Sequence, residues 1–266
     1  MGKIISVANQ KGGVGKTTSS INIAAALAML GRKILLVDAD SQANSTSGLG
    51  VDSDSLKLSI YNCLLEDVDV KNAILKTNIE NLDLLPSHID LVGAEIELPR
   101  LHNGGKVLRE KLKPIKSEYD VIFIDCSPSL GMITVNSLTA ADTVLIPVQC
   151  EYFALEGIGK LLNTIKLVQS ELNPDLLIEG FVCTMYDSRT TLANEVVAEV
   201  RNHFGELCFE TLIKRNVKVS EAPSHGMPVV TYDKTSTGAQ NYMELAREFL
   251  QRNKMTKMGG VNKIIE

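Results

Sequence analysis

The stretch Lys11-Gly12-Gly13-Val14-Gly15-Lys16-Thr17-Thr18 decides the fold, and it lies between a short apolar run and a long segment rich in alanine and leucine. The apolar run, residues 4–8, has the composition of a buried strand, and the segment that begins near Ser19 has helical spacing. Glycines in the loop between them let backbone N–H groups turn towards a phosphate, and the start of a helix adds a partial positive charge. A strand, a glycine-rich loop and a helix in this order predict a nucleoside triphosphate site.

The loop departs from the general phosphate-loop pattern G-x-x-x-x-G-K-[ST] at its first position, where Gln10 replaces glycine, and it contains a second lysine. Lys16 lies at the mouth of the helix and is expected to reach the β- and γ-phosphates, while the hydroxyl of Thr17 is expected to bind Mg²⁺. Lys11 precedes the turn, where a side chain can point away from its own subunit. We therefore predict that Lys11 serves a phosphate presented by another chain; the alternative is an ordinary solvated lysine.

The composition is that of an ordinary globular protein. Its 266 residues are 44% hydrophobic and 22% charged, which suffices for one large α/β domain without metal or disulfide staples. The five cysteines are widely spaced, with no C-x-x-C pair, which favours reduced thiols in a cytoplasmic protein and argues against structural zinc. No apolar stretch approaches the ~20 residues that a membrane-spanning helix needs.

The net charge of −5 does not by itself indicate binding to nucleic acid, but the charge is unevenly distributed. Residues 1–185 carry 16 basic and 22 acidic residues, whereas residues 186–266 carry 11 basic and 10 acidic residues. A basic surface is therefore expected, if anywhere, in the last third of the chain.

Apolar runs recur along the chain and predict the strands of a sheet at residues 4–8, 34–37, 82–85, 121–124, 143–148, 177–184 and 208–213. Segments with helical spacing alternate with most of them, at residues 19–30, 107–115, 155–172, 192–204 and 239–250. This alternation predicts a single α/β domain with a mostly parallel, twisted sheet and helices on both faces. We assign residues 1–252 to that domain and the polar residues 253–266 to a flexible tail.

Carboxylates follow two of the predicted strands, at the edge where ligands bind in such sheets. Asp38 and Asp40 are residues i and i+2 of an extended chain and point the same way, unless they belong to a solvated turn. Asp125 ends a buried apolar run, as in a Walker B strand that reaches Mg²⁺ through a water or a further contact. A buried carboxylate without a cation either costs several kcal/mol or takes up a proton, so Asp125 argues for a bound metal.

The loop at residues 11–18 resembles that of the deviant Walker A ATPases at every signature position. In that family the first lysine crosses a dimer interface to the partner's ATP, which implies that Lys11 acts in trans. The resemblance implies that Asp40 orients the attacking water, with Asp38 in support. Prolines that are usual in the family are replaced here by Ser41 and Ser127. The residues implied in binding ATP are Lys11, Gly12, Gly13, Val14, Gly15, Lys16, Thr17 and Thr18.

Residues 147–157 read PVQCEYFALEG, which is similar to the P-V-Q-x-E-Y-x-A-L-E-G block of ParA/Soj-type partition ATPases. The resemblance spans residues 3 to about 250 and includes residues 90–98, 184–190 and 216–226. In such relatives the loop before Asn216 closes over the adenine, which implies that Asn216 lies at the base. Soj-like members contact DNA phosphates through positions that correspond here to Arg189 and Lys218.

The resemblance implies a molecular switch. Mg²⁺ and ATP hold two subunits face to face, the homodimer binds DNA without sequence preference, and hydrolysis releases it. A ParB-type centromere-binding protein stimulates that step in relatives, and the expected location is the cytoplasm, in association with the nucleoid. One alternative is a MinD-like regulator at a membrane surface, although the tail lacks a continuous amphipathic helix. Another is a metabolic or redox enzyme on the same scaffold, which the cysteine spacing does not favour.

Overall fold

A mostly parallel sheet forms the centre of the protein. The computed structural model describes residues 2–151 and 154–255, and only the backbone of residues 154–156. The seven strands are β1 (Lys3–Val7), β2 (Ile34–Ala39), β3 (Leu75–Lys76), β4 (Leu82–Leu85), β5 (Val121–Cys126), β6 (Thr143–Gln149) and β7 (Leu177–Thr184). Their order is β3-β4-β2-β5-β1-β6-β7, and only β3 and β4, at one edge, pair antiparallel. The predicted fold class, a single mostly parallel α/β domain, is confirmed.

Helices connect the strands and cover both faces of the sheet. The α-helices are α1 (Lys16–Met29), α2 (Asn44–Gly48), α3 (Ile60–Leu65), α4 (Val70–Ala73), α5 (Leu91–Glu97), α6 (Val107–Leu112), α7 (Met132–Ala140), α8 (Ala154–Glu171), α9 (Thr191–Phe204), α10 (Val217–Glu221), α11 (Val229–Tyr232) and α12 (Thr237–Arg252). Short 3₁₀ helices span Ser53–Ser55, Leu98–Arg100, Gly104–Lys106, Lys113–Glu118, Gly205–Leu207 and Ala222–His225.

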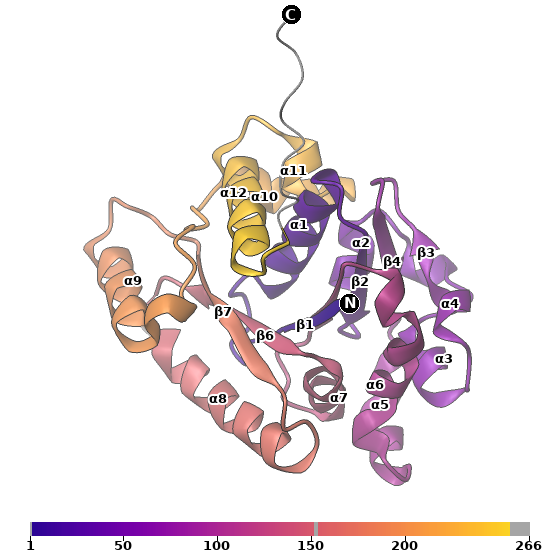
Figure 1. Ribbon diagram of the computed structural model, residues 1–266. Coiled ribbons are helices and arrows are strands. Elements are labelled where there is room, and N and C mark those ends of the chain that lie inside the picture. Colours follow the sequence, from indigo (N-terminus) through magenta and orange to yellow (C-terminus); the bar gives the residue numbers. More distant parts are fainter. Residues whose placement is uncertain (1, 152–153, 256–266) are drawn as a thin grey trace, which may run out of the picture.

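Two hydrophobic cores lie on opposite faces of the sheet. Figure 1 shows α1 and α12 above the sheet and α5, α6, α7 and α8 below it. Successive strand residues alternate between the cores, so that Ile4 packs in one and Ile5 in the other. Because both faces are covered, the strands are apolar almost throughout, which is the pattern that made them recognisable in the sequence.

The sheet brings the carboxyl ends of β1, β2 and β5 together. Strand β5 pairs with β1 on one side and with β2 on the other, and Asp125 is the partner of both Val7 and Asp38. The phosphate loop leaves β1 at this edge. The site is therefore assembled from the ends of three adjacent strands.

The prediction of a strand at residues 208–213 is wrong. This segment forms only isolated bridges to the region of β7, at Cys208 and Lys214. The backbone N–H groups of Glu210 and Thr211 donate instead to the carboxylate of Glu248, over 2.8 and 2.9 Å. Cys208, like Phe209 and Ile213, is buried in the core. The apolar pattern of this segment therefore reflects its burial and does not indicate pairing as a strand.

The end of the domain is held by polar contacts. After α12 ends at Arg252, the side chain of Asn253 donates a 2.7 Å hydrogen bond to Glu179 and accepts a 2.6 Å hydrogen bond from Lys3. The predicted tail begins at residue 253, and its residues 256–266 lie outside the described residues.

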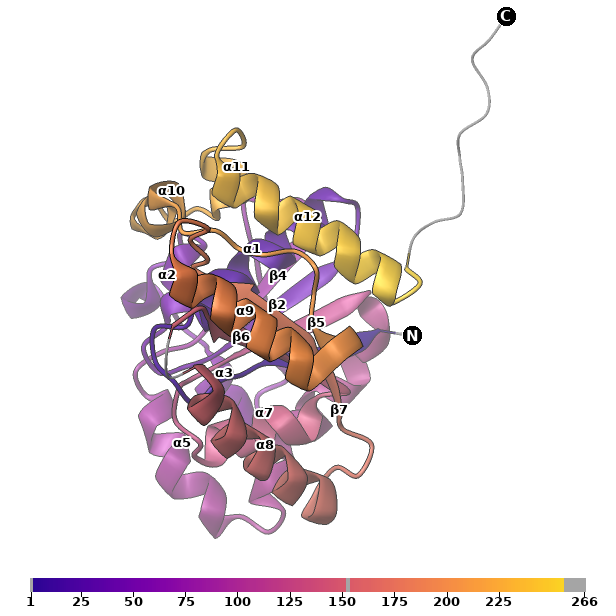
Figure 2. The same cartoon turned by 90° about the vertical axis from the view of Figure 1, so that its left-hand side faces the viewer.

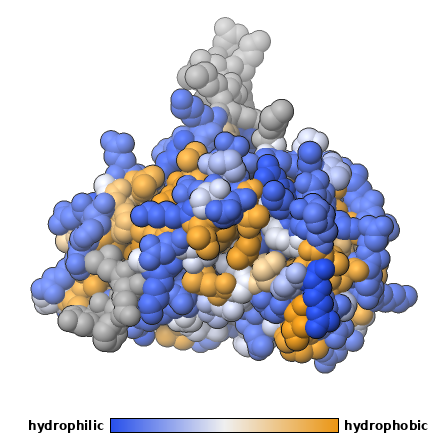
Figure 3. All heavy atoms as spheres, turned by 90° about the horizontal axis from the view of Figure 1, so that it is seen from below, coloured by the Kyte–Doolittle hydropathy of each residue, from blue (hydrophilic) through white to orange (hydrophobic). Residues whose placement is uncertain are grey.

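The face below the sheet carries both apolar and polar side chains. Figure 3 shows the face below the sheet, where hydrophobic side chains are interspersed with hydrophilic ones. Among the described residues no helix is both long and apolar enough to cross a bilayer.

Candidate functional site

The phosphate loop turns sharply between β1 and α1. Gly13 and Gly15 have φ of 75° and 85°, a backbone conformation that strains residues with a side chain. No atom within 4 Å would meet a Cβ at Gly13, so the backbone angle, and not crowding, requires glycine there. Thr184 Oγ1 donates 2.8 Å to the carbonyl of Val14 and ties the loop to the end of β7.

A pocket of about 510 Å³ opens over this loop. It brings together predicted residues that are far apart in the sequence. Two residues of the loop do not line it: Val14, which is buried, and Lys11. The lining residues are Gly12, Gly13, Gly15, Lys16, Thr17, Thr18, Asp40, Ser41, Gln42, Asn44, Ser127, Pro128, Ser129 and Met185.

Lys16 is the cation of this pocket. Its side chain is buried, and its Nζ donates 3.1 Å to the carbonyl of Lys11. Burial lowers the pKa of Lys16, while the nearby carboxylates of Asp125 and Asp40 act in the opposite direction. A phosphate at this position would supply the charge that the buried ammonium group needs.

Asp125 has the surroundings of a ligand for a hard cation. Its fully buried carboxylate accepts hydrogen bonds from Ser20 Oγ (2.9 Å) and Ser45 Oγ (2.8 Å). Burial nevertheless raises its pKa to about 6, against the effect of the hydroxyl groups of Ser45, Thr17 and Ser20. Within the described residues it has no ion pair with Lys, Arg or His.

The donor set at this point fits Mg²⁺. It contains one carboxylate and the hydroxyl of Thr17, both oxygen ligands, beside a pocket for phosphates. Groups of three or more His, Cys, Asp or Glu that could enclose a metal are absent from the part of the chain that the structure describes. Mg²⁺ is commonly held in this manner, by few protein oxygens together with phosphate oxygens.

Asp38 is buried behind Asp40 and anchors the segment after β2. Its Oδ2 accepts hydrogen bonds from the backbone N–H (2.8 Å) and the hydroxyl (2.7 Å) of Thr46. Burial and the charge of Asp125 raise the pKa of Asp38 to about 7. Its Oδ1 accepts a 3.2 Å hydrogen bond from the N–H of Asp40, so Asp38 contacts the backbone of that residue.

Asp40 lies at the pocket itself. Its Oδ1 accepts a 3.0 Å hydrogen bond from the backbone N–H of Gln42, and its carbonyl accepts a 2.9 Å hydrogen bond from the N–H of Ala43. These contacts hold the carboxylate in a tight turn at the pocket that Lys16 and Thr17 also line, where it can face a bound phosphate group.

Lys11 is turned away from the pocket of its own loop. Its Nζ lies 3.8 Å from Glu151 Oε2, and Glu151 Oε1 lies 3.6 Å from Arg215. Both Lys11 and Glu151 are only partly covered, so the ion pair is weak. Residues 152 and 153 of the motif at 147–157 lie outside the described residues, as do the side chains of residues 154–156.

A smaller cavity of about 280 Å³ adjoins the phosphate pocket and shares Gly15, Thr18 and Met185 with it. Asn216 lines this cavity. Its Oδ1 accepts 2.9 Å from the N–H of Lys218 and caps α10, so the side chain is held in a fixed orientation.

Each cation predicted to contact DNA is paired with a carboxylate close by in the chain. Arg189 donates to Asp187 through Nε (2.9 Å) and Nη2 (2.7 Å), and Lys218 Nζ lies 2.8 Å from Glu221. The segments just before these two cations are tied together, because the N–H of Arg215 donates a 3.0 Å hydrogen bond to the carbonyl of Tyr186. Figure 2 shows α9, which follows the loop of Arg189, and α10, which contains Lys218, on the same side of the molecule.

Comparison with known proteins identifies the family to which the chain belongs. A family model described as an AAA domain matches residues 2–178. The chain is 52% identical over 248 residues to "Sporulation initiation inhibitor protein Soj" of Bacillus subtilis, covering 93% of this chain and 98% of that protein. The chain belongs to the ParA/Soj family of partition ATPases. A second member of the family, "Chromosome partitioning protein ParA" of Myxococcus xanthus, is 49% identical, with 95% of this chain and 89% of that protein covered.

Solved structures of P-loop proteins superpose on this ParA/Soj chain. One, named cobyrinic acid a,c-diamide synthase from Mycobacterium smegmatis with bound ADP and magnesium, is 40% identical with a TM-score of 0.84, and 96% of each chain is covered. Another, the septum site-determining protein MinD of Pyrococcus horikoshii with Mg-ADP, is 28% identical with a TM-score of 0.75, covering 93% of this chain and 96% of that one.

Several residues of the ParA/Soj site carry no recognisable signal in the sequence. Ser20 could have been inferred, because it lies one helical turn after Lys16 and its hydroxyl also donates to the Lys16 carbonyl. Ser45 and Thr46 occur in a polar stretch that resembles any loop. Thr184 ends a strand far from the loop that it supports.

Proposed function

We propose that this ParA/Soj protein is an ATP-dependent DNA-partitioning switch. ATP binding assembles a homodimer with the nucleotides between the subunits, the dimer binds DNA without sequence preference, and hydrolysis releases it. A ParB-type centromere-binding protein stimulates the hydrolysis, which is slow by itself. The names of the partition proteins that are about half identical over nearly the full length support this proposal.

The proposal rests on one observation: two lysines of the same loop point to different places. Lys16 is buried in the pocket, whereas Lys11 extends away from it, and its one ion pair within the described residues is the weak contact with Glu151. A lysine so placed can leave its intramolecular partner at little cost and reach the phosphates of a facing subunit. The nucleotide then becomes part of the dimer interface, and its γ-phosphate controls assembly.

The chemistry follows from the remaining residues of the pocket. Lys16 and the backbone N–H groups of the loop bind the phosphates, and Thr17 and Asp125 would hold Mg²⁺, which stabilises charge that develops on the transferred phosphoryl group. Asp40 accepts a hydrogen bond from the attacking water and orients it in line with the leaving group. Asn216 lies beside the base.

Binding to DNA needs only charge. Arg189 lies in the loop before α9 and Lys218 lies in α10, and a backbone hydrogen bond from Arg215 to Tyr186 joins the segments just before them. We therefore assign both cations to one surface on each subunit. Phosphate contacts of this kind carry no sequence information and weaken as salt rises. Two copies of the surface in a dimer bind more strongly than one through avidity, so nucleotide controls DNA affinity through assembly. The protein is accordingly expected on the nucleoid, with residues 1–252 as the switch and residues 253–266 as a tail.

Retention on DNA in the presence of ATP, ADP or no nucleotide tests the proposal. We expect retention with ATP only, and its loss in Arg189→Glu but not in Arg247→Glu, a change at an exposed residue on α12. Equal retention with ADP would contradict the switch. ATP-dependent binding to anionic lipid vesicles in place of DNA would favour the MinD-like alternative.

A further inference from the structure

A second large cavity lies at the edge of the sheet opposite the phosphate loop. Its volume is about 430 Å³, within the range of small-molecule sites. It is lined by residues at the amino ends of strands, among them Ile4 of β1, Asp142 before β6 and Asp175 before β7. The nucleotide pocket lies at the carboxyl ends of the strands, so the activity proposed above makes no use of this cavity.

One wall of the cavity is a row of cations. Lys106, Arg109, Lys113 and Lys116 are spaced by three, four and three residues along the continuous helical stretch that contains α6. This spacing places them on one face of a helix. The neighbouring face of the same stretch is apolar and holds it against the core through the buried side chains of Leu108, Leu112 and Ile115.

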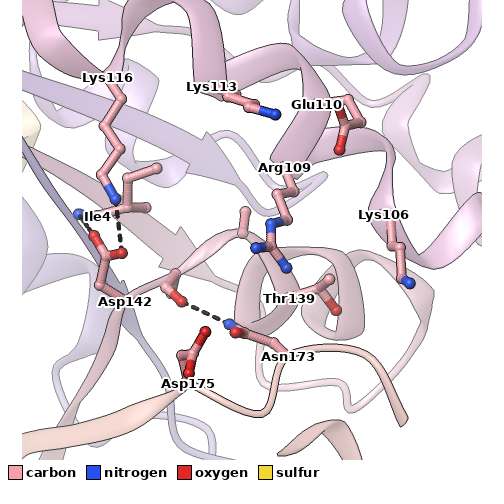
Figure 4. Close-up of a pocket in the computed structure, with 12 residues that line it drawn as sticks. Ile4, Lys106, Arg109, Glu110, Lys113, Lys116, Thr139, Asp142, Asn173 and Asp175 are labelled. Carbon is pink, nitrogen blue, oxygen red and sulfur yellow. Dashed lines mark hydrogen bonds and ion pairs between the residues drawn. The ribbon is translucent and has the colours of Figure 1, made fainter.

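The cation at the end of this row is neutralised, whereas the other three are not. Lys116 Nζ donates 2.7 Å to Asp142 Oδ1, and Asp142 Oδ2 accepts 2.8 Å from the N–H of Ile4 (Figure 4). The side chains of Lys106, Arg109 and Lys113 form no ion pair or hydrogen bond within the described residues. Unpaired like charges around one hollow repel each other and attract an anion into it.

The floor of the cavity is built so that it does not oppose an anion. Carbonyl groups at the end of a helix carry partial negative charge, and α7 ends here. The buried side chain of Asn173 donates to the carbonyls of Leu138 (3.2 Å) and Ala141 (2.8 Å) and satisfies them. Figure 4 shows the guanidinium group of Arg109 over Asn173, extending into the cavity.

Two carboxylates also line the cavity, Glu110 beside the cations and Asp175 beside Asn173. They disfavour a ligand that is anionic throughout and provide acceptors for hydroxyl groups. The combination suits a molecule with one phosphate end and one hydroxylated end. We infer that this cavity binds a phosphorylated sugar or nucleoside, with the phosphate between Arg109 and Lys113 and the hydroxyl groups at Asp175.

Calorimetric titration with ribose 5-phosphate tests the inference. The full chain is first saturated with ADP and Mg²⁺, so that the probe does not enter the phosphate loop. We expect saturable binding of one molecule per chain. The double variant Arg109→Gln, Lys113→Gln should bind about tenfold more weakly or worse, because two charge-assisted hydrogen bonds are lost. Arg247→Gln, at an exposed arginine elsewhere, should bind as the parent does.

Three results would overturn the inference. They are the absence of saturable binding at millimolar ribose 5-phosphate, equal affinity in the double variant, and equal affinity for inorganic phosphate, which lacks the hydroxylated end. A further arm measures DNA retention with ATP. If the double variant loses DNA retention while its melting temperature is unchanged, the row of cations serves nucleic acid and the small-molecule assignment fails.

Discussion

Asp38 and Asp125 are paired across β2 and β5, and both carboxyl groups are fully buried. Their other contacts are with hydroxyl and backbone N–H groups. Two carboxylates so close in a low dielectric cannot both ionise without a large cost, so the pair favours a proton or a cation. The protein thereby couples the stability of its core to the charge of its nucleotide site.

The pair predicts an unusual pH dependence of stability. In the folded chain the pKa of Asp38 is raised from 3.8 to about 7, and that of Asp125 to about 6. The folded state therefore binds these protons more tightly than the unfolded state does. Their contribution to the free energy of unfolding is present below about pH 4 and is lost as the pH rises to about 7.

Urea denaturation at about pH 5 and about pH 8, without nucleotide, checks this expectation. Asp38→Asn should show a smaller decline in unfolding free energy over this range than the parent, because a neutral side chain replaces the titrating group. Adding ADP and Mg²⁺ should raise stability most at the higher pH. An identical decline in the parent and in Asp38→Asn would show that Asp38 ionises normally.

Lys11→Ala should separate nucleotide binding from dimerisation. The side chain lies outside the pocket and its ion pair with Glu151 is long and exposed, so its loss should change nucleotide affinity and folding little. We expect ATP-dependent dimerisation to be abolished, as measured by light scattering with a non-hydrolysable ATP analogue. Lys16→Ala is the matched control and should lose nucleotide binding itself. A normal dimer in Lys11→Ala would remove this residue from the interface.

The residues of the site that could be predicted are those whose roles depend on local sequence. Lys16 and Thr17 follow from the loop, and Asp125 from its place at the end of an apolar strand, since carboxyl ends of parallel strands meet at one edge. Ser45 and Thr184 could not be predicted. Their hydrogen bonds join segments 80 and 170 residues apart, to Asp125 and to the loop respectively.

In the fold, too, the elements with a local signal in the sequence could be predicted and the others could not. Long apolar strands and helices of regular period were recognised, because burial on both faces leaves a continuous signal. The segment 208–213 carries that signal too, yet Glu248, nearly 40 residues further on, binds the N–H groups of Glu210 and Thr211, and the segment forms no continuous strand pairing with β7. The short edge strand β3 spans two residues, one of them exposed, and has no such signal.

Asp40→Ala should stop hydrolysis while leaving nucleotide bound. Asp40 contacts its own turn and the pocket but is not among the groups expected to hold phosphate or Mg²⁺. We expect phosphate release to fall by about 100-fold or more, typical of a lost water-positioning group, and the ATP-bound dimer to persist. Asp54→Ala, at an exposed position of the 3₁₀ helix Ser53–Ser55, should behave as the parent. Unchanged phosphate release in Asp40→Ala would assign the water to another residue.

Glu221→Gln should strengthen binding to DNA. Glu221 holds Lys218 through a 2.8 Å contact and places a negative charge on the surface proposed for phosphates, where it competes with DNA for the ammonium group. Both side chains are partly exposed, so the ion pair is weak and folding should be little affected. We expect retention on duplex DNA with ATP to increase several-fold at low salt, with the gain declining as salt rises. Glu171→Gln, which removes the same charge at the exposed end of α8, should leave retention unchanged, because its effect on distant phosphates is screened. An equal gain in both variants would mean that net charge alone, and not the release of Lys218, controls the affinity.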